Sequence, residues 1–339
     1  MATLGGYFSE NMDAAVTNKD SIILGNKYRI SLLTDGLVRL EYNNDGQFED
    51  RPTQRVIFRK FPKIKYTVTK SETLLQVITS NFTIDYVMEK AFGPLKGLGN
   101  DLRITINNTN LSWVYDSSKG KNYGALSYSL DNFRGKLKLD YGLYSGSGFA
   151  CLDDSKSLVL NSDGSYSKRS GKVVDLYVFV YGTNLGNCLQ DYYSLTGKPQ
   201  LIPRFALGNW WFRNIKYNSE ELRGLLTQFK EERVPLSVFL LGDKWCSSSN
   251  PFVFNNSLDM ALFRNDDKLK FGLSVDPGKR VKGNDFSFFP LDNSKLNIYV
   301  NDVILPLTSQ GIEVFCVDYD NKNDKYALGL INSYQYAVN

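Results

Sequence analysis

The chain contains no histidine. This absence excludes Ser-His-Asp triads, Cys-His pairs and histidine metal sites, all of which need an imidazole as a base or a ligand. Acid–base chemistry near neutral pH would then depend on carboxylates, or on a lysine, cysteine or tyrosine with a strongly shifted pKa. The GxGxxG, P-loop and EF-hand patterns are also lacking. We therefore expect neither a cofactor nor a metal site.

Cysteine is scarce, and long apolar runs are lacking. Cys151, Cys188, Cys246 and Cys316 form no CxxC pair, and this spacing favours reduced thiols over a disulfide framework or a zinc site. No run approaches the roughly 20 apolar residues that cross a bilayer, and the first residues lack the features of a secretory signal. We therefore expect a soluble, cytoplasmic protein without membrane contact.

A strong charge of one sign is lacking as well. The net charge is +4 over 339 residues, and basic residues are interspersed with acidic ones, so no basic stripe is visible. We therefore expect no nucleic-acid partner. The 42% of hydrophobic and 14% of aromatic residues indicate a globular chain, and its length favours two domains.

Residues 1–190 predict a β-sandwich domain. Short runs rich in valine, isoleucine, tyrosine and threonine alternate with Asn-Lys and Asp-Gly turns. Such regularly spaced strands are typical of a sandwich. The expected strands are Ser21–Leu24, Lys27–Leu33, Leu37–Tyr42, Lys63–Val68, Thr73–Thr79, Phe82–Met88, Leu102–Ile106 and Val173–Val180.

Residues 191–339 predict part of a TIM-type β/α barrel. Phe205–Trp211 and Leu236–Leu241 are apolar runs long enough for buried strands. The helix between them would begin at Asn218 or Ser219, both of which are good capping residues. Apolar strands joined by an amphipathic helix are typical of a parallel sheet. The inward face of this helix would carry four apolar residues at helical spacing, Leu222, Leu225, Leu226 and Phe229.

The alternation continues with strands at Leu269–Val275 and Glu313–Val317, which makes about four βα units after Pro199. Helices are expected at Asn187–Leu195 and Tyr326–Tyr336. A (β/α)₈ barrel needs eight units in about 250 residues, so the sequence predicts half of a barrel with open sheet edges. The N-terminal domain, another protein chain or a second copy of this chain could cover these edges, or the unit could rearrange.

The run Pro203-Arg-Phe-Ala-Leu-Gly-Asn-Trp-Trp211 has Leu195-Thr-Gly-Lys-Pro199 before it and Val234-Pro-Leu-Ser-Val238 after it. These segments resemble the start of the catalytic barrel of glycoside hydrolase family 31, which contains α-glucosidases and α-xylosidases. The resemblance covers most of the chain, and it implies a β-domain ahead of a barrel that acts on α-linked sugars. Looser matches lie upstream, at Gly36–Tyr42, Phe48–Gln54 and Gly148–Ser155.

The nucleophile motif of this family, W-x-D-M-N-E, is similar to Cys316-Val-Asp-Tyr-Asp-Asn321. The resemblance makes Asp318 the nucleophile-equivalent residue, at the carboxyl end of a strand where barrel enzymes carry their catalytic groups. Cys316 and Asn321 depart from the motif. The alternative role of Asp318 is to cap the turn after its strand.

Two further motifs depart from the family. The family's D-x-D-W appears as Gly242-Asp-Lys-Trp245, so Lys244 stands where a pocket aspartate is expected. A lysine there would reverse the local charge and leave sugar hydroxyls without their acceptor. In the family's L-N-x-H-P motif, Ser274 replaces asparagine and Asp276 replaces histidine.

Three tryptophans and Asp276 complete the candidate substrate-binding residues. Trp210, Trp211 and Trp245 keep the family's aromatic positions, either as sugar-stacking faces or as core. The family's acid/base aspartate comes from later strands, which we expect this chain to lack. Retaining glycosidases need both carboxyl groups.

These departures favour a truncated, degenerate relative of the α-glucosidases without glycosidase turnover, retained as a structural, binding or assembly component. The first alternative is an active α-glycosidase with Asp318 as nucleophile, completed by a partner chain. The second alternative is a carbohydrate-binding protein that recognises an α-linked sugar. Replacing Asp318 by asparagine separates the first two, because only an active enzyme has turnover to lose.

Overall fold

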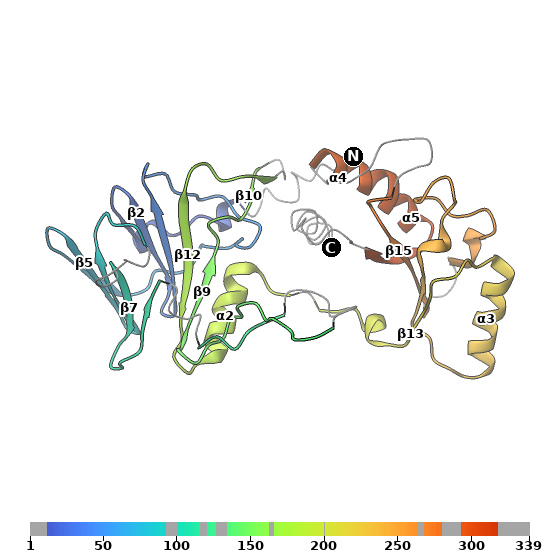
Figure 1. Cartoon of the computed structure of the whole chain (residues 1–339), viewed down its shortest axis with the longest axis horizontal. Coiled ribbons are helices and arrows are strands. Elements are labelled where there is room, and N and C mark those ends of the chain that lie inside the picture. The colour runs from blue at the N-terminus through green and yellow to red at the C-terminus, as the bar shows by residue number, and fades with distance from the viewer. Residues whose placement is uncertain are drawn as a thin grey trace. The chain divides into compact units, whose positions relative to one another are not determined.

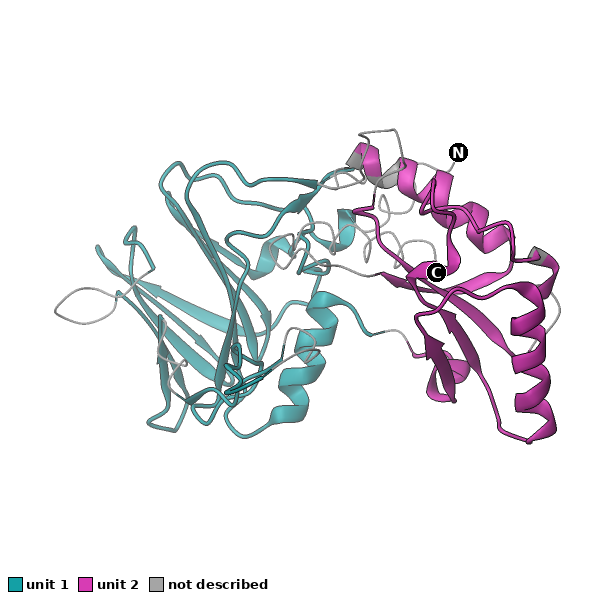
Figure 2. Cartoon of the chain, turned by 45° about the vertical axis from the view of Figure 1, so that its right-hand side comes forward, with its two compact units in different colours: residues 1–199 teal, residues 200–339 magenta. Residues whose placement is uncertain are grey.

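The computed structural model describes residues 12–92, 101–115, 121–126, 134–162, 166–199, 201–263, 268–279 and 293–317. The described chain is mostly β-structure with few helices. It divides into two compact units, residues 1–199 and 200–339 (Figure 2). The domain boundary predicted at residue 190 lies inside helix α2 (Leu185–Thr196) of unit 1.

Unit 1 contains two five-stranded antiparallel sheets, with strand orders β1-β2-β3-β12-β9 and β4-β5-β6-β7-β8 (Figure 1). The strands that the sequence predicts are all present, with ends that differ by at most three residues. The bounds are β1 (Ile22–Leu24), β2 (Tyr28–Thr34), β3 (Leu37–Asn43), β4 (Tyr66–Lys70), β5 (Leu74–Thr79), β6 (Phe82–Val87), β7 (Leu102–Ile106), β8 (Ser112–Val114), β9 (Phe149–Asp153) and β12 (Val173–Val180), beside a two-stranded pair β10 (Val159–Leu160) and β11 (Tyr166–Ser167).

One apolar core holds side chains of both five-stranded sheets. Alternate residues of β12, such as Val178, point into it from the first sheet, and Ile84 and Trp113 enter it from the second. Each of these side chains is at most 1% exposed. Side chains of a strand alternate between its faces, so one face of each sheet supplies this core.

The other face of the first sheet packs against α2 and carries buried charges. Tyr177 and Phe179 of β12 form a second apolar cluster with Cys188 and Leu195 of α2. Beside this cluster, Arg39 is fully buried, and its Nε and Nη2 atoms donate to the two oxygens of Asp175 at 2.9 and 2.8 Å. Both oxygens of Asp175 are therefore paired inside unit 1.

Unit 2 contains a four-stranded parallel sheet in the order β13-β14-β15-β16 (Figure 1). Helix α3 (Ser219–Glu231) connects β13 to β14, which is the predicted β-helix-β step. The strands are β13 (Trp210–Arg213), β14 (Val238–Leu241), β15 (Lys270–Val275) and β16 (Ile312–Val317); α4 (Asn293–Tyr299), the π-helical turn η6 (Val300–Ile304) and α5 (Leu305–Ser309) precede β16. Short 3₁₀ turns are η1 (Lys19–Ser21) in unit 1, and η3 (Arg204–Leu207), η4 (Asp243–Trp245) and η5 (Met260–Phe263) in unit 2.

Helix α3 begins where the sequence predicts. The Asn218 side chain accepts from the Glu221 backbone N–H at 2.9 Å, and the Glu221 carboxylate accepts from the Asn218 N–H at 2.9 Å. This reciprocal capping box satisfies two N–H groups that the first turn leaves without partners. Of the predicted inward face only Leu222 is fully buried, and the other three apolar side chains are half-buried.

The strand predicted at Phe205–Trp211 begins later, at Trp210, and a 3₁₀ turn occupies residues 204–207. Pro203 starts this turn, and Gly208 ends it. A Cβ atom at Gly208 would collide with the Ser237 side chain, so the chain approaches the start of β14 more closely than a larger residue allows. The apolar run was therefore correctly placed beside β14, but the sequence pattern did not show that its first half is a turn.

No helix within the described residues is long and apolar enough to cross a bilayer. The four cysteines, all of which lie in the described residues, form no disulfide. The helix predicted at 326–336 lies outside the described residues, as does Asp318.

Candidate functional site

The segments that follow β13, β14 and β15 lie at the same end of the sheet of unit 2, because the strands are parallel. Leu241 at the end of β14 is in register with Arg213 of β13 and with Leu273 of β15. Asn214, Gly242 and Asp276 directly follow these strands. Strand β16 ends at Val317, in register with Val275, and Asp318 is the next residue in the chain. This end of the sheet is where β/α enzymes carry their chemistry.

Gly242, which stands at a predicted aspartate position, is packed tightly against the end of β13. A Cβ atom at Gly242 would lie 2.5 Å from the Asn214 Oδ1 atom and 2.7 Å from its Cα atom. The Cα atom belongs to the backbone and cannot move aside without shifting β13. A carboxylate side chain at position 242 therefore does not fit beside Asn214 in this arrangement.

Asp243 is the carboxylate described after β14, and it forms an ion pair with Lys279, whose Nζ lies 3.3 Å from the Asp243 Oδ2 atom. Burial alone would raise the pKa of Asp243, but a hydrogen bond with the Asn214 side chain and the Lys279 ammonium outweigh this effect. Together with Lys244, they hold the pKa of Asp243 below its ordinary value. The group is therefore an anion at neutral pH and poorly suited to donate a proton.

Asp276, the residue at the family's histidine position, has a local structural partner. Its Oδ1 atom accepts from the Gly278 backbone N–H at 2.8 Å, which closes the turn after β15. Such side-chain turns are a common role for aspartate at the end of an element. The turn also holds Lys279 in reach of Asp243.

An open cavity of about 730 Å³ lies beside the end of β14. Its charged lining residues are Lys216, Asp243 and Lys244, and Cys246 also lines it. Serine and asparagine side chains at positions 247, 248 and 255–257 complete a polar lining. Burial raises the pKa of the Cys246 thiol, which is therefore neutral at neutral pH. Lys244, the predicted departure from the family's pocket aspartate, lines this cavity, whereas the candidate substrate-binding residue Asp276 does not.

Trp245 does not line this cavity. It is 2% exposed, and its ring meets Phe254 edge to face at a centroid distance of 4.9 Å. Its Nε1 atom donates to the Ser274 carbonyl oxygen at 2.7 Å, which ties the end of β14 to β15. Asn255 donates from its side chain to the Trp245 carbonyl oxygen at 2.9 Å. Trp245 therefore anchors the loop that carries the serine and asparagine side chains.

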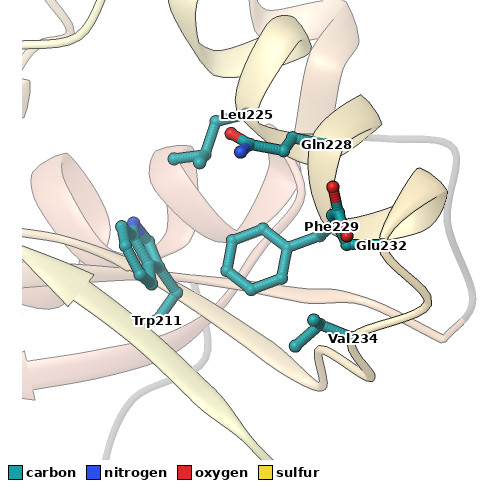
Figure 3. Close-up of a pocket in the computed structure, with 6 residues that line it drawn as sticks. All are labelled: Trp211, Leu225, Gln228, Phe229, Glu232 and Val234. Atoms are coloured by element: carbon teal, nitrogen blue, oxygen red, sulfur yellow. The ribbon is translucent and has the colours of Figure 1, made fainter.

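Trp210 and Trp211 lie on opposite faces of β13, as neighbours on a strand must. Trp211 faces α3, where its ring meets that of Phe229 at a centroid distance of 5.2 Å (Figure 3). Both rings line a separate apolar pocket of about 180 Å³ beside the last turns of α3, with Leu225 and Val234 (Figure 3). Trp210 is 40% exposed, and its Nε1 atom donates to the Ala206 carbonyl oxygen at 3.0 Å. Neither tryptophan lines the large cavity.

Lys216, Lys279 and the loop after η4 also lie at this end of the sheet, and no sequence motif pointed to them. Lys216 comes three residues after β13, and Lys279 four residues after β15. Both could have been predicted at this end of the sheet from their short distance in the chain to a strand end. Within the described residues, no group of three cysteine, aspartate or glutamate side chains is placed to hold a metal ion.

Parts of this chain are similar in sequence to known proteins. No family model matches the chain. An α-xylosidase of Saccharolobus solfataricus is 29% identical over 128 residues, which cover 35% of this chain and 17% of that protein. An isomaltosyltransferase of Sporosarcina globispora is 22% identical over 204 residues, which cover 57% of this chain and 18% of that protein.

Solved structures extend the match over nearly the whole chain. A GH31 α-xylosidase from a soil metagenome, complexed with xylose, aligns with 94% of this chain and 63% of its own length, at a TM-score of 0.63 and 12% identity. The chain is therefore similar to GH31 proteins, and we call it GH31-like in this sense. A cycloalternan-forming enzyme from Listeria monocytogenes aligns with 95% of the GH31-like chain and 43% of its own length, at a TM-score of 0.57 and 12% identity. At such low identity these structures show a shared fold.

The GH31-like chain matches less than a fifth of the length of the first two curated relatives. The relatives are glycosidases and a related transferase by name. Their activities belong to proteins much longer than the matched segment.

Proposed function

We propose that this GH31-like chain is a degenerate member of its group, without glycosidase turnover, that serves as a structural, binding or assembly component. Its unit 1 would be the family's N-terminal β-sandwich and its unit 2 a part of the β/α barrel. One observation carries the proposal. The carboxylate after β14 is neutralised by Lys279, and a second lysine, Lys244, stands beside it.

Glycoside cleavage with retention needs two carboxyl groups about 5–5.5 Å apart, one of which holds a proton at working pH. The two carboxylates described just after β14 and β15 do not suit this work. Asp243 has a lowered pKa and a lysine partner, and Asp276 accepts a hydrogen bond from its own turn. A carboxylate kept ionised by a nearby cation is the reverse of a general acid, which needs a raised pKa.

The lack of hydrogen-bond acceptors for sugar hydroxyls also supports the absence of turnover. A site built to bind sugar hydroxyls rejects ligands that leave its polar groups unpaired, so replacing an acceptor by a lysine is costly for a neutral sugar. Lys244 is exposed and lines the cavity. Gly242 has no room for a compensating side chain. By contrast, the apolar strands of unit 2 and the inward residues Leu222, Leu225 and Phe229 of α3 resemble those of the family.

The test is hydrolysis of chromogenic α-glucosides and α-xylosides by the purified chain, beside its Asp318→Asn variant. We expect no turnover by either protein while circular dichroism shows both folded. Turnover that disappears in the variant would instead establish the first alternative, an active α-glycosidase with Asp318 as nucleophile. The position of Asp318 directly after β16 is the observation that favours this alternative.

A carbohydrate-binding role without turnover is the second alternative, and the polar cavity after β14 favours it. Binding of an α-linked disaccharide such as maltose or isomaltose, measured by calorimetry in the absence of product formation, would establish it. A purely structural component would show no heat of binding with these neutral sugars.

We further propose that another protein chain, either a second copy or a different protein, covers β13. In the described sheet β13 is an edge strand, and its apolar side chains Trp210 and Phe212 are 40% and 55% exposed. Exposed apolar edges favour association. Light scattering of the purified chain should give a mass above 38.5 kDa if the partner is a second copy. We also propose that the protein lies in the cytoplasm, where its four cysteines, which form no disulfide in the structure, would stay reduced.

A further inference from the structure

The cavity beside the end of β14 has a lining that fits an unusual ligand for a GH31-like chain. At about 730 Å³ it falls within the range of roughly 300–1,000 Å³ that small-molecule sites occupy. Most such sites are lined by apolar side chains. Here every lining residue except Cys246 is a lysine, an aspartate, a serine or an asparagine. A polar ligand with several hydroxyl groups matches this surface better than an apolar one.

The charge of the lining is positive. Lys216 comes from the segment after β13 and Lys244 from the turn η4 after β14, so two separate elements each supply an ammonium group. Asp243 is the one carboxylate among the described lining residues, and Lys279 neutralises it. The thiol of Cys246 is neutral because burial raises its pKa. The two lysines are therefore left to attract an anion.

We propose that this cavity binds a sugar that carries an anionic group, either a carboxylate or a phosphate. Lys216 and Lys244 receive the anion, since a lysine ammonium is a flexible point charge that accommodates either group. The exposed side chains of Ser248 and Asn256 in the loop after η4 receive the sugar hydroxyls. Asn255 is 5% exposed and bonded to the Trp245 carbonyl, so the base of this loop is held in place before any ligand arrives.

This inference rests on the proposed non-hydrolytic role of the same end of the sheet. It deepens that role by naming the class of ligand. Lys244 stands where the family has a pocket aspartate. An aspartate there accepts hydrogen bonds from sugar hydroxyls, whereas the lysine binds an anionic group, so the replacement changes the specificity of the site.

The test is isothermal titration of the full chain at low ionic strength with D-glucuronic acid, glucose 6-phosphate and D-glucose. We expect at least one of the two anionic sugars to bind roughly tenfold or more tightly than glucose, since charge-assisted hydrogen bonds are about twice as strong as neutral ones. The tighter of the two identifies the carboxylate or the phosphate as the anion. Added salt should weaken this binding, because the lysines are exposed and screened.

The variants Lys216→Gln and Lys244→Gln should each lower the affinity for the anionic sugar by about fivefold or more. Lys230→Gln, which removes an exposed lysine at the end of α3, is the matched control and should leave it unchanged. Thermal melting checks that all three variants are folded. Equal affinity for glucose and both anionic sugars, or unchanged affinity in both pocket variants, would overturn the inference.

Inorganic phosphate and acetate separate a sugar site from a simple anion site. We expect both to bind at least about tenfold more weakly than the preferred anionic sugar, because they cannot use the hydroxyl and amide groups of the loop. Equal affinity would overturn the sugar part of the inference. Turnover of chromogenic α-glucosides is a separate measurement. Its appearance would contradict the proposed function while leaving the preference for anions to be read from the titrations.

Discussion

In unit 1, the side chains of Arg39 and Asp175 are fully buried, whereas in unit 2 those of Lys279 and Asp243 are 37% and 42% exposed. Both are ion pairs, but their surroundings differ. Charges taken out of water must find all their partners inside the protein, and removing one partner leaves an uncompensated buried charge. Exposed charges keep much of their hydration and contribute little to stability.

The difference indicates which charges hold the fold and which are available to a ligand. Around Arg39 the network also includes Glu41, Arg169 and Asp154, all at most 5% exposed on their side chains. Arg39 and Glu41 lie on β3 and Asp175 on β12, whereas Asp154 directly follows β9 and Arg169 precedes β12. The charges of the cavity in unit 2 are supplied by turns beyond the strand ends, where substitution changes binding without disturbing the core.

The largest effect is expected from Arg39→Met in unit 1. This change leaves Asp175 and Glu41 buried without their shared arginine, and it should lower the free energy of unfolding of unit 1 by about 3–5 kcal/mol. Urea unfolding followed by circular dichroism measures it. Arg51→Met is the control, since Arg51 is 47% exposed and its pair with Glu49 should contribute less than about 1 kcal/mol. Equal losses in the two variants would contradict the comparison.

Acid should destabilise unit 1 through Asp175. Burial alone would raise the pKa of this carboxyl, but Arg39 and Arg169 outweigh burial and hold the pKa well below its ordinary value. A carboxyl with a lowered pKa in the folded state stabilises the fold above its unfolded pKa of about 3.9, and this stability is lost as the pH falls further.

Glu41 and Asp154 work in the opposite direction, because burial raises the pKa of each. The folded state holds their protons more tightly, so a fall in pH towards about 4 relieves their cost. Stability measured by urea unfolding should therefore rise modestly on mild acidification and then fall steeply below about pH 4. A stability that stays constant down to pH 2 would count against the role of Asp175.

A smaller effect is expected from Asn218→Ala in unit 2. The change removes the side chain that caps α3 and should lower the free energy of unfolding of unit 2 by about 1 kcal/mol. Asn218→Asp keeps a capping oxygen and serves as the matched control. If both variants lose the same stability, the capping box does not explain where this helix begins.

The smallest effect is expected from Lys279→Met. The exposed pair with Asp243 should contribute at most about 1 kcal/mol to stability, since solvent screens it. The pKa of the Asp243 carboxyl should rise, because the ammonium that lowers it is gone. Carboxyl chemical shifts followed by NMR against pH measure this change. A loss of stability as large as that of Arg39→Met would erase the distinction between the two regions.

Much of the fold could be predicted from the sequence, because local patterns decide it. Alternation in β5, with every second residue buried, and the apolar run of β14 are visible without a structure. The cap of α3 is likewise a local signal. The turn at residues 204–207 was missed because its apolar side chains look like a strand, and only the close approach of Gly208 to Ser237 distinguishes it.

The candidate site was less predictable. Motif positions flagged Gly242 and Lys244 as altered, but the pairing of Asp243 with Lys279 joins residues 36 positions apart. Trp245 could be stacking face or core in a motif, and its 2% exposure places it in the core of the described structure. Such distinctions depend on which loops fold over a strand end.

By itself the sequence determined the kinds of element, their order along the chain and the absence of any histidine chemistry. Propensity, capping and apolar periodicity act between residues that are close in the chain, so they can be read from it. Only the tertiary structure decided which charges are buried and which line a cavity. Burial depends on the elements that pack against a residue from distant parts of the chain. In this protein that difference separates the charges that hold unit 1 together from the lysines that face the cavity of unit 2.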